Sequence, residues 1–197
     1  MLKFTNTKRI ESVDFEEYLK VKAFSNSFLK SEQGGISPLF IASDKVRLGS
    51  MVDGILTEPE TVDITSEFYP IAKEIAVAIS NKFGAESWNF LESQISFTVT
   101  MGAFGVAMLM KGRLDKFGLN RVWDLKVTHV KEAQIDALIE FMGYANQMWL
   151  YSKGMGTTEP AVLIFYSVPD KKVIYRFIDI SSDSNEFFEG KMLKFGK

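Results

Sequence analysis

KGRLDKFGLNRVWDLK, residues 111–126, has the pattern of a β-hairpin, in which two alternating runs are joined by a turn within FGLN. Another strand-like run precedes it, so that QISFTVTM, GVAMLMKGRLD and NRVWDLKV together predict an antiparallel meander. The hairpin is unusual because charged residues occupy positions that a buried sheet would fill with apolar ones. Isolated charges inside a fold are costly unless they are paired or bound to metal.

The register of this hairpin decides which charges meet. A turn centred between Leu119 and Asn120 sets Asp115 directly opposite Asp124, whereas a slip of two residues gives Asp115 a different partner. Both registers place Asp115, Asp124 and Lys126 on one face, because side chains alternate along a strand. The sequence therefore predicts two converging carboxylates with an ammonium group close by.

Converging carboxylates repel each other, and one takes up a proton unless a cation lies between them. Mg²⁺ would relieve the repulsion, because it binds carboxylate, carbonyl and phosphate oxygens, and the backbone carbonyl of Leu125 would be a further ligand. Lys126 would then position an attacking water or help to deprotonate it during phosphodiester hydrolysis. The alternative is an exposed hairpin with solvated charges, since Asp opposite Lys is a common cross-strand pair.

The rest of the chain predicts helices around this sheet. Short helices are expected in the N-terminal third, then a helix in DKVRLGSMVDGILTEPE and a clearer amphipathic one in FYPIAKEIAVAISNKFG. KEAQIDALIEFMGYANQMWLYSKG predicts one long helix, and AVLIFYSV and KKVIYRFIDI predict two more strands. We expect one α/β domain with a central mixed sheet flanked by helices. Residues 1–92 form its mainly helical part, residues 93–181 the sheet with the long helix, and residues 182–197 a tail.

Composition is that of an ordinary globular protein. The chain has 197 residues, of which 46% are hydrophobic and 24% charged, values near the averages for globular domains that indicate neither a disordered chain nor a membrane protein. No segment has the pattern of a signal peptide or a bilayer span, so we expect a cytoplasmic protein without a membrane partner. The net charge of -2 gives no general attraction to nucleic acid, and any polyanion site must be local.

Four segments, in order along the chain, resemble nuclease motifs. GRLD followed by WDLK resembles motifs II and III of the PD-(D/E)xK nuclease superfamily, and YANQMWLY resembles the QxxxY helix of its RecB-like branch. LGSMVDGILTEPE resembles a helix of RecE-like exonucleases with a pattern close to GxxxHxxLLEPE. SNSFLKSEQGGISPLF resembles their S-x-S-x-L-K…P segment. The chain thus resembles phage RecE/YqaJ-type nucleases.

The resemblance implies a restriction-endonuclease-like core and a 5′–3′ exonuclease acting on duplex DNA ends in phage-type recombination. The expected location is then the cytoplasm of a bacterial or phage-infected host cell. It implies two Mg²⁺ or Mn²⁺ ions held by Asp53, Asp115, Asp124 and the Leu125 carbonyl, with Asp115, Asp124 and Lys126 as catalytic residues. Asp53 stands where the family usually has a histidine, and a carboxylate is a harder ligand than imidazole.

Substrate contacts are implied for a further set of residues on the hairpin, the QxxxY helix and the N-terminal segment: Arg113, Tyr144, Gln147, Tyr151, Ser25 and Ser27. Several of these residues could instead have a purely structural role. Gln147 and Tyr151 would also suit the polar edge of a packed helix, and Ser25 and Ser27 would suit helix caps. The resemblance further implies a single-strand annealing protein as partner and a homo-oligomeric ring that encloses DNA.

Two other functions are alternatives. One is a structure-specific or nicking endonuclease on the same fold. The other is a catalytically inactive DNA-binding or regulatory protein, for which Asp53 would be the first mark of a lost site. Against the second stands the intact set of Asp115, Asp124 and Lys126, which an inactive site has no physical reason to retain together.

Overall fold

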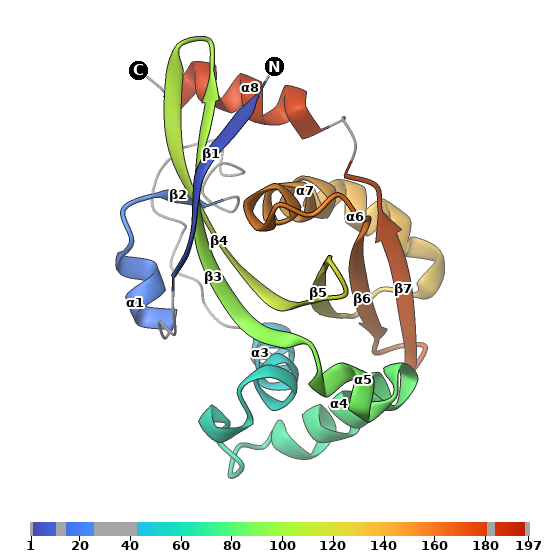
Figure 1. Cartoon of the computed structure of the whole chain (residues 1–197). Coiled ribbons are helices and arrows are strands. Elements are labelled where there is room, and N and C mark those ends of the chain that lie inside the picture. Colours follow the sequence, from blue (N-terminus) through green and yellow to red (C-terminus); the bar gives the residue numbers. More distant parts are fainter. Residues whose placement is uncertain (1, 11–14, 26–42, 181–183, 196–197) are drawn as a thin grey trace.

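The computed structural model of the chain describes residues 2–10, 15–25, 43–180 and 184–195 (Figure 1). Ser27 and almost all of the SNSFLKSEQGGISPLF segment lie outside the described residues. None of the helices in the described part has the length and apolar character that a membrane span requires.

A seven-stranded mixed sheet forms the centre of the described structure, in the order β1-β3-β4-β5-β6-β7, with β2 paired to β4. The strands are β1 (Lys3–Ile10), β2 (Phe24–Ser25), β3 (Glu92–Ala103), β4 (Val106–Gly118), β5 (Arg121–Thr128), β6 (Ala161–Ser167) and β7 (Lys172–Ile178). Neighbours from β1 to β5 pair antiparallel, β5 and β6 are parallel, and β6 and β7 are antiparallel. The predicted α/β architecture with a mixed sheet is confirmed, and the predicted meander corresponds to β3, β4 and β5.

The β4–β5 hairpin has the first of the two predicted registers. Its turn residues 119–120 have φ angles of 54° and 55°, the left-handed backbone of a type I′ turn, whose twist matches that of paired strands. Pairing extends from the turn to Lys116 opposite Trp123. The next position along both strands therefore sets Asp115 opposite Asp124.

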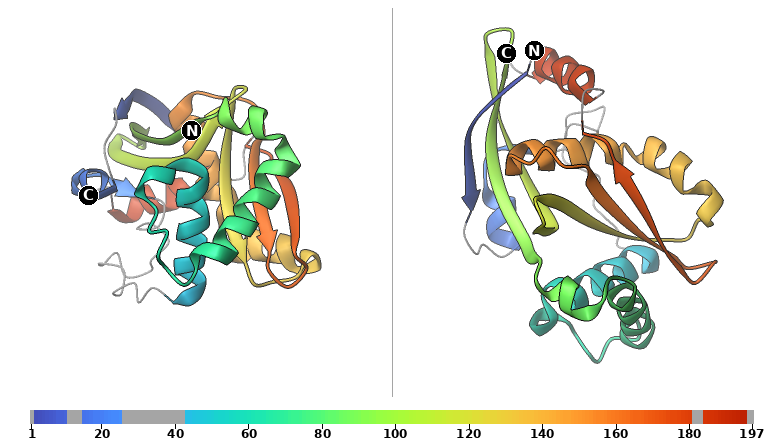
Figure 2. Two further views of the ribbon diagram at one scale, coloured as in Figure 1. Left: turned by 90° about the horizontal axis from the view of Figure 1, so that it is seen from below. Right: turned by 45° about the vertical axis from the view of Figure 1, so that its right-hand side comes forward.

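Helices cover both faces of β5–β7 (Figures 1 and 2). On one face lie α3 (Asp44–Thr57) and α4 (Tyr69–Phe83), and on the other α6 (Ile135–Met142) and α7 (Tyr144–Met155). The other described helices are α1 (Phe15–Lys20), α5 (Ala85–Asn89) and α8 (Ser184–Phe195), with 3₁₀ turns at Pro59–Thr61 and Glu132–Gln134. Strand β6 lies between the two helical layers, and its sequence AVLIFYS is buried almost throughout. A continuous apolar run is what a strand covered on both faces requires.

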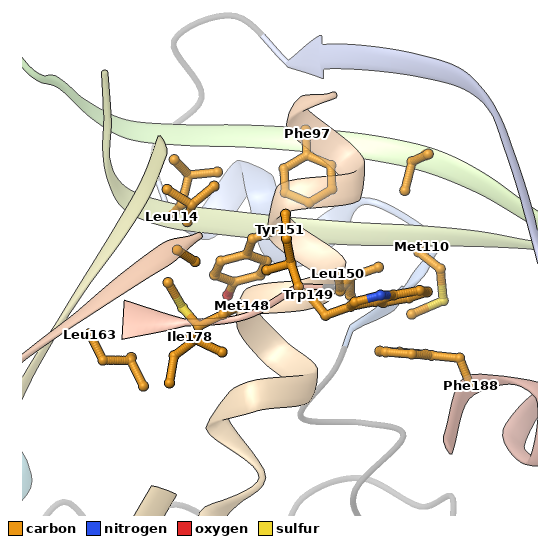
Figure 3. Packing of buried hydrophobic residues seen from close by; sticks show 14 of the residues in the cluster. Phe97, Met110, Leu114, Met148, Trp149, Leu150, Tyr151, Leu163, Ile178 and Phe188 are labelled. Carbon is orange, nitrogen blue, oxygen red and sulfur yellow. The ribbon is translucent and has the colours of Figure 1, made fainter. Parts of the chain in front are cut away.

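Two hydrophobic cores hold these layers together. One joins β1, β3 and β4 to α7 and α8, and Figure 3 shows its central side chains. Within it, Trp149 stacks on Phe188 with ring centroids 4.9 Å apart, and Phe97 meets Tyr151 edge to face at 5.9 Å. The other core joins α3 and α4 to the opposite face of β5 and β6. The α3 helix is thereby held against the strand that carries Asp124 and Lys126.

The predicted single long helix is wrong, because the chain forms two helices that meet at Gly143. This residue has a φ angle of 58°, in the left-handed region that glycine adopts without strain, and it ends α6 and precedes α7. Both helices still pack on the same core, through Leu138 and Ile139 of α6 and Ala145 of α7. Met142 is 40% exposed, whereas Met148 and Leu150 of α7 are fully buried.

The N-terminal third contains strands that the sequence pattern did not predict. β1 pairs with β3 at one edge of the sheet, and the short β2 pairs with β4 in parallel. Most of β1 is exposed, so its sequence KFTNTKRI lacks the apolar alternation by which strands are recognised. Ser25 lies at the end of β2.

Candidate active site

Three carboxylates and one ammonium group converge beside the β4–β5 hairpin. Asp115 comes from β4, Asp124 and Lys126 from β5, and Asp53 from α3, which packs on both strands. Each carboxylate is close enough to affect the protonation of another, since Asp53 and Asp124 act on Asp115, and Asp124 acts on Asp53. The fold thus brings together side chains that lie more than 70 positions apart in the chain.

Asp124 is the most enclosed of these groups, with 2% of its side chain exposed. One carboxylate oxygen forms an ion pair with Nζ of Lys126, and the other accepts a hydrogen bond from Nε2 of Gln147 at 3.3 Å. Nε2 of Gln147 also donates to the hydroxyl of Tyr151 at 3.1 Å. Residues four apart share one helical face, so α7 presents both polar groups of its QxxxY pattern to Asp124.

Two glycines allow Tyr151 to reach this position. A Cβ atom on Gly112 of β4 would lie 2.5 Å from Phe97 and 2.8 Å from Tyr151, and a Cβ atom on Gly154 of α7 would overlap the Phe97 ring. Any larger residue would have to displace an aromatic ring from a packed core. The close approach of α7 to β3 and β4 therefore depends on these glycines.

Asp115 is held by the backbone of the neighbouring strand. Its Oδ2 accepts a hydrogen bond from the N–H of Leu125 at 2.7 Å. Leu125 lies opposite Ile164 in the parallel pairing of β5 with β6, so the group that orients Asp115 is itself fixed in the sheet. The Leu125 carbonyl, expected as a metal ligand, belongs to the same residue.

Asp53 is oriented by residues that the sequence did not single out. Nε2 of Gln94, in β3, donates to Oδ2 of Asp53 at 3.1 Å and to Oγ1 of Thr57 at 2.9 Å. Oγ1 of Thr57 in turn donates to the backbone carbonyl of Asp53 at 2.8 Å. Only the register of β3 against β4, which sets residue 94 opposite Asp115, would have pointed to Gln94.

Arg113, expected to contact substrate, donates hydrogen bonds to side chains of the protein itself. Its Nε donates to Oε1 of Gln94 at 2.7 Å, and its Nη2 pairs with Oε1 of Glu58 at 2.8 Å. Only 9% of its side chain is exposed. Glu58 directly follows α3 within the TEPE sequence that carries the family resemblance, so Arg113 ties the end of α3 to β4.

Tyr144, Ser25 and Ser27 are the remaining residues for which substrate contact was expected. The ring centroid of Tyr144 lies 5.4 Å from Nζ of Lys126, at the edge of the carboxylate cluster. Ser25 pairs with Lys111 of β4, two residues along the strand from Arg113. Ser27 lies outside the described residues.

The shifted pKa values of Asp53 and Asp115 indicate an excess of negative charge within the cluster. Burial, together with the charge of Asp124, raises the pKa of Asp53 to about 6, although Lys126 and the Gln94 hydrogen bond oppose the change. Burial and the charges of Asp53 and Asp124 raise the pKa of Asp115 well above its usual range. Burial would lower the pKa of Lys126, but the carboxylates of Asp124 and Asp115 outweigh it and raise that pKa above its ordinary value. Lys126 therefore keeps its proton at neutral pH.

The donor set suits a hard divalent cation. Carboxylate oxygens are the ligands that Mg²⁺ and Mn²⁺ prefer, and a cation relieves the mutual repulsion that perturbs Asp53 and Asp115. In the described part of the chain, no three His, Asp or Glu side chains are arranged to hold an ion as they stand. The ammonium of Lys126 is the cation that lies against Asp124. Asp53, Asp115 and Asp124 are the oxygen donors that fit a metal by their chemistry.

Comparison with known proteins leaves the family open. Neither the protein-family models nor the curated proteins give a match. Among solved structures, the chain is similar to SSO0001, with 11% identity and a TM-score of 0.45 over 93% of this chain and 87% of that one. It is also similar to Rai1 of Scheffersomyces stipitis, solved with 3′-NADP⁺ and a calcium ion, at 16% identity and a TM-score of 0.31 over 52% of this chain. The match spans only 32% of that Rai1 chain. At these values neither likeness carries a functional argument.

Proposed function

We propose that this protein is a divalent-cation-dependent deoxyribonuclease with a PD-(D/E)xK-type core. Its most specific form is a 5′–3′ exonuclease that acts on duplex DNA ends in phage-type recombination. The observation that carries the proposal is the convergence of Asp53, Asp115 and Asp124 around the ammonium of Lys126. Buried charges that repel one another are unfavourable for folding and are typical of catalytic sites, where the reaction requires groups with shifted pKa values.

Each residue has a role that follows from its surroundings. Asp53, Asp115 and Asp124, with the Leu125 carbonyl, would hold Mg²⁺ or Mn²⁺, as two ions if the family resemblance holds. When bound, such a cation neutralises phosphodiester charge and lowers the pKa of water. Lys126 stays protonated and acts as a hydrogen-bond donor that positions the attacking water, rather than as a base.

The QxxxY helix supports the same chemistry through Asp124. Because Nε2 of Gln147 bonds both to Asp124 and to Tyr151, the carboxylate is held by α7 as well as by Lys126. The two residues therefore act first on the geometry of Asp124, and contact with a DNA phosphate is a second role. A ring-shaped assembly and a single-strand annealing partner are part of the proposal through the family resemblance.

The test is a digest of linear, nicked and covalently closed circular duplex DNA in the presence of Mg²⁺ or Mn²⁺. Wild type is compared with Asp124→Ala, Lys126→Ala and the surface control Asp136→Ala, whose carboxylate is 73% exposed and pairs with Arg176. We expect linear DNA to be degraded by wild type and by the control, and not by the two site variants. Labels at the 5′ or the 3′ ends identify the polarity.

The outcomes separate the competing functions. Cleavage of closed circles favours an endonuclease on the same fold. DNA binding without cleavage in either metal favours the non-catalytic alternative. Cleavage that survives in both site variants contradicts the assignment of the site.

A further inference from the structure

Gln94 has a backbone conformation that its place in a long strand does not explain. Its φ angle is 49°, in the left-handed region that side chains other than glycine rarely adopt. Pairing between β3 and β4 runs without a gap from residue 92 to residue 103 except here, where it passes from Ser93↔Lys116 to Ile95↔Leu114. Gln94 is thus the one residue of β3 between positions 92 and 103 that is left out of the β3–β4 ladder, opposite Asp115. Strained residues of this kind cluster at functional sites.

Both polar atoms of the Gln94 side chain form hydrogen bonds. Its Oε1 accepts from Nε of Arg113, and its Nε2 donates to Asp53 and to Thr57. The orientation of the amide is determined, because a guanidinium has no acceptor and so must face the amide oxygen. The amide nitrogen then necessarily faces the Asp53 carboxylate.

Arg113 is anchored as well, by its ion pair with Glu58. A chain of bonds therefore runs from Glu58 through Arg113 and Gln94 to Asp53, starting and ending at the C-terminal end of α3. It fixes a residue of the helix against β3 and against β4, the strand that carries Asp115.

We propose that Gln94 is a positioning residue that sets the Asp53 carboxylate for divalent-cation binding. This inference rests on the proposed function, and it assigns the strained backbone of Gln94 a purpose, which is to aim its amide at Asp53. Partners that orient a metal ligand typically contribute about 10- to 100-fold to metal affinity or activity. We expect an effect of about this size on the binding of Mn²⁺.

Gln94→Gly separates positioning from stability. Glycine adopts the left-handed backbone without strain, so the variant loses the side-chain amide and the backbone strain at residue 94 is removed. The matched control is Phe104→Gly, at an exposed residue with a φ angle of 53° in the turn between β3 and β4. Gln94→Glu is the second variant, because it keeps an acceptor for Arg113 but cannot donate to Asp53.

The readouts are Mn²⁺ affinity by titration calorimetry, the melting temperature in EDTA, and cleavage as a function of Mn²⁺ concentration. We expect the Mn²⁺ dissociation constant to rise about 10- to 100-fold in Gln94→Gly, and at least as much in Gln94→Glu. The melting temperature of Gln94→Gly should stay close to that of wild type, and cleavage should recover at high Mn²⁺. Phe104→Gly should bind Mn²⁺ like wild type.

Wild-type affinity in both Gln94 variants, while wild type binds Mn²⁺ and cleaves DNA, would overturn this inference alone. A lowered melting temperature without any change in Mn²⁺ affinity would also overturn it, since that is the result of a purely structural role. A wild-type protein that neither binds Mn²⁺ nor cleaves DNA would overturn the proposed function and this inference together.

Discussion

Asp53→Asn should make the metal-free protein more stable at neutral pH. The pKa of Asp53 is raised from 3.8 to about 6, mainly because the carboxyl group is buried. The folded protein must therefore ionise an unfavourably placed carboxylate above pH 6, whereas the unfolded chain ionises it near pH 3.8. Asparagine removes this charge and keeps an oxygen that can accept from Gln94.

The size of the gain follows from the pKa difference. At about 1.4 kcal/mol per pKa unit, a change from 3.8 to about 6 costs the folded wild type up to about 3 kcal/mol. Because the pKa of this carboxyl is higher in the folded protein, its contribution to wild-type stability is fully present below pH 3.8 and is lost as the pH rises through about 6. The gain of Asp53→Asn should be small near pH 4, grow up to about pH 6 and then level off.

Urea unfolding in EDTA at several pH values between 4 and 8 measures this difference. The control is Asp136→Asn, an exposed carboxyl whose pKa is lowered by a hydrogen bond from Arg176, so that its pH dependence has the opposite sign. If Asp53→Asn is no more stable than wild type at pH 8, Asp53 is not a strained, buried carboxylate and the electrostatic account of the site fails.

Three further predictions concern the same region. Lys126→Met should abolish cleavage, and it should destabilise the protein by about 3 kcal/mol at pH 8 because Asp124 loses its buried ion partner. An unchanged midpoint of urea unfolding would contradict this prediction. Gly154→Ala should cost about 1–3 kcal/mol of stability by displacing Phe97, and Phe97→Leu should recover part of that loss in the double variant. Saturating Mg²⁺ should raise the melting temperature of wild type but not of Asp124→Asn, as followed by calorimetry, and equal shifts would place the ion elsewhere.

Local patterns were enough to predict the part of the site that lies on the hairpin. Two turn residues and the two-residue period of a strand fix the relation of Asp115 to Asp124, whatever the rest of the fold does. The approach of α3 and α7 to this hairpin could not be derived from periodicity. Asp53 and Gln147 were predicted as site residues only from the resemblance to nuclease motifs, and the fold places both beside the hairpin.

Other features were invisible because they depend on long-range packing. Gln94 acts through a left-handed backbone and the register of β3 against β4, and neither has a signal in QISFTVTM. The break at Gly143 was missed because a single glycine inside a helical pattern is usually tolerated. Arg113 was expected to meet substrate, but a charged residue on a strand does not reveal that Glu58 lies within reach.

The most direct test of the central claim is a crystal structure of the protein with Mn²⁺, in which anomalous scattering locates the ion. The account predicts an anomalous peak within coordination distance of carboxylate oxygens of Asp115 and Asp124, with Asp53 on the same ion or on a second ion beside it. Lys126 would then have moved away from direct contact with Asp124. A peak elsewhere on the molecule, or no peak at a Mn²⁺ concentration that supports cleavage, would contradict the account.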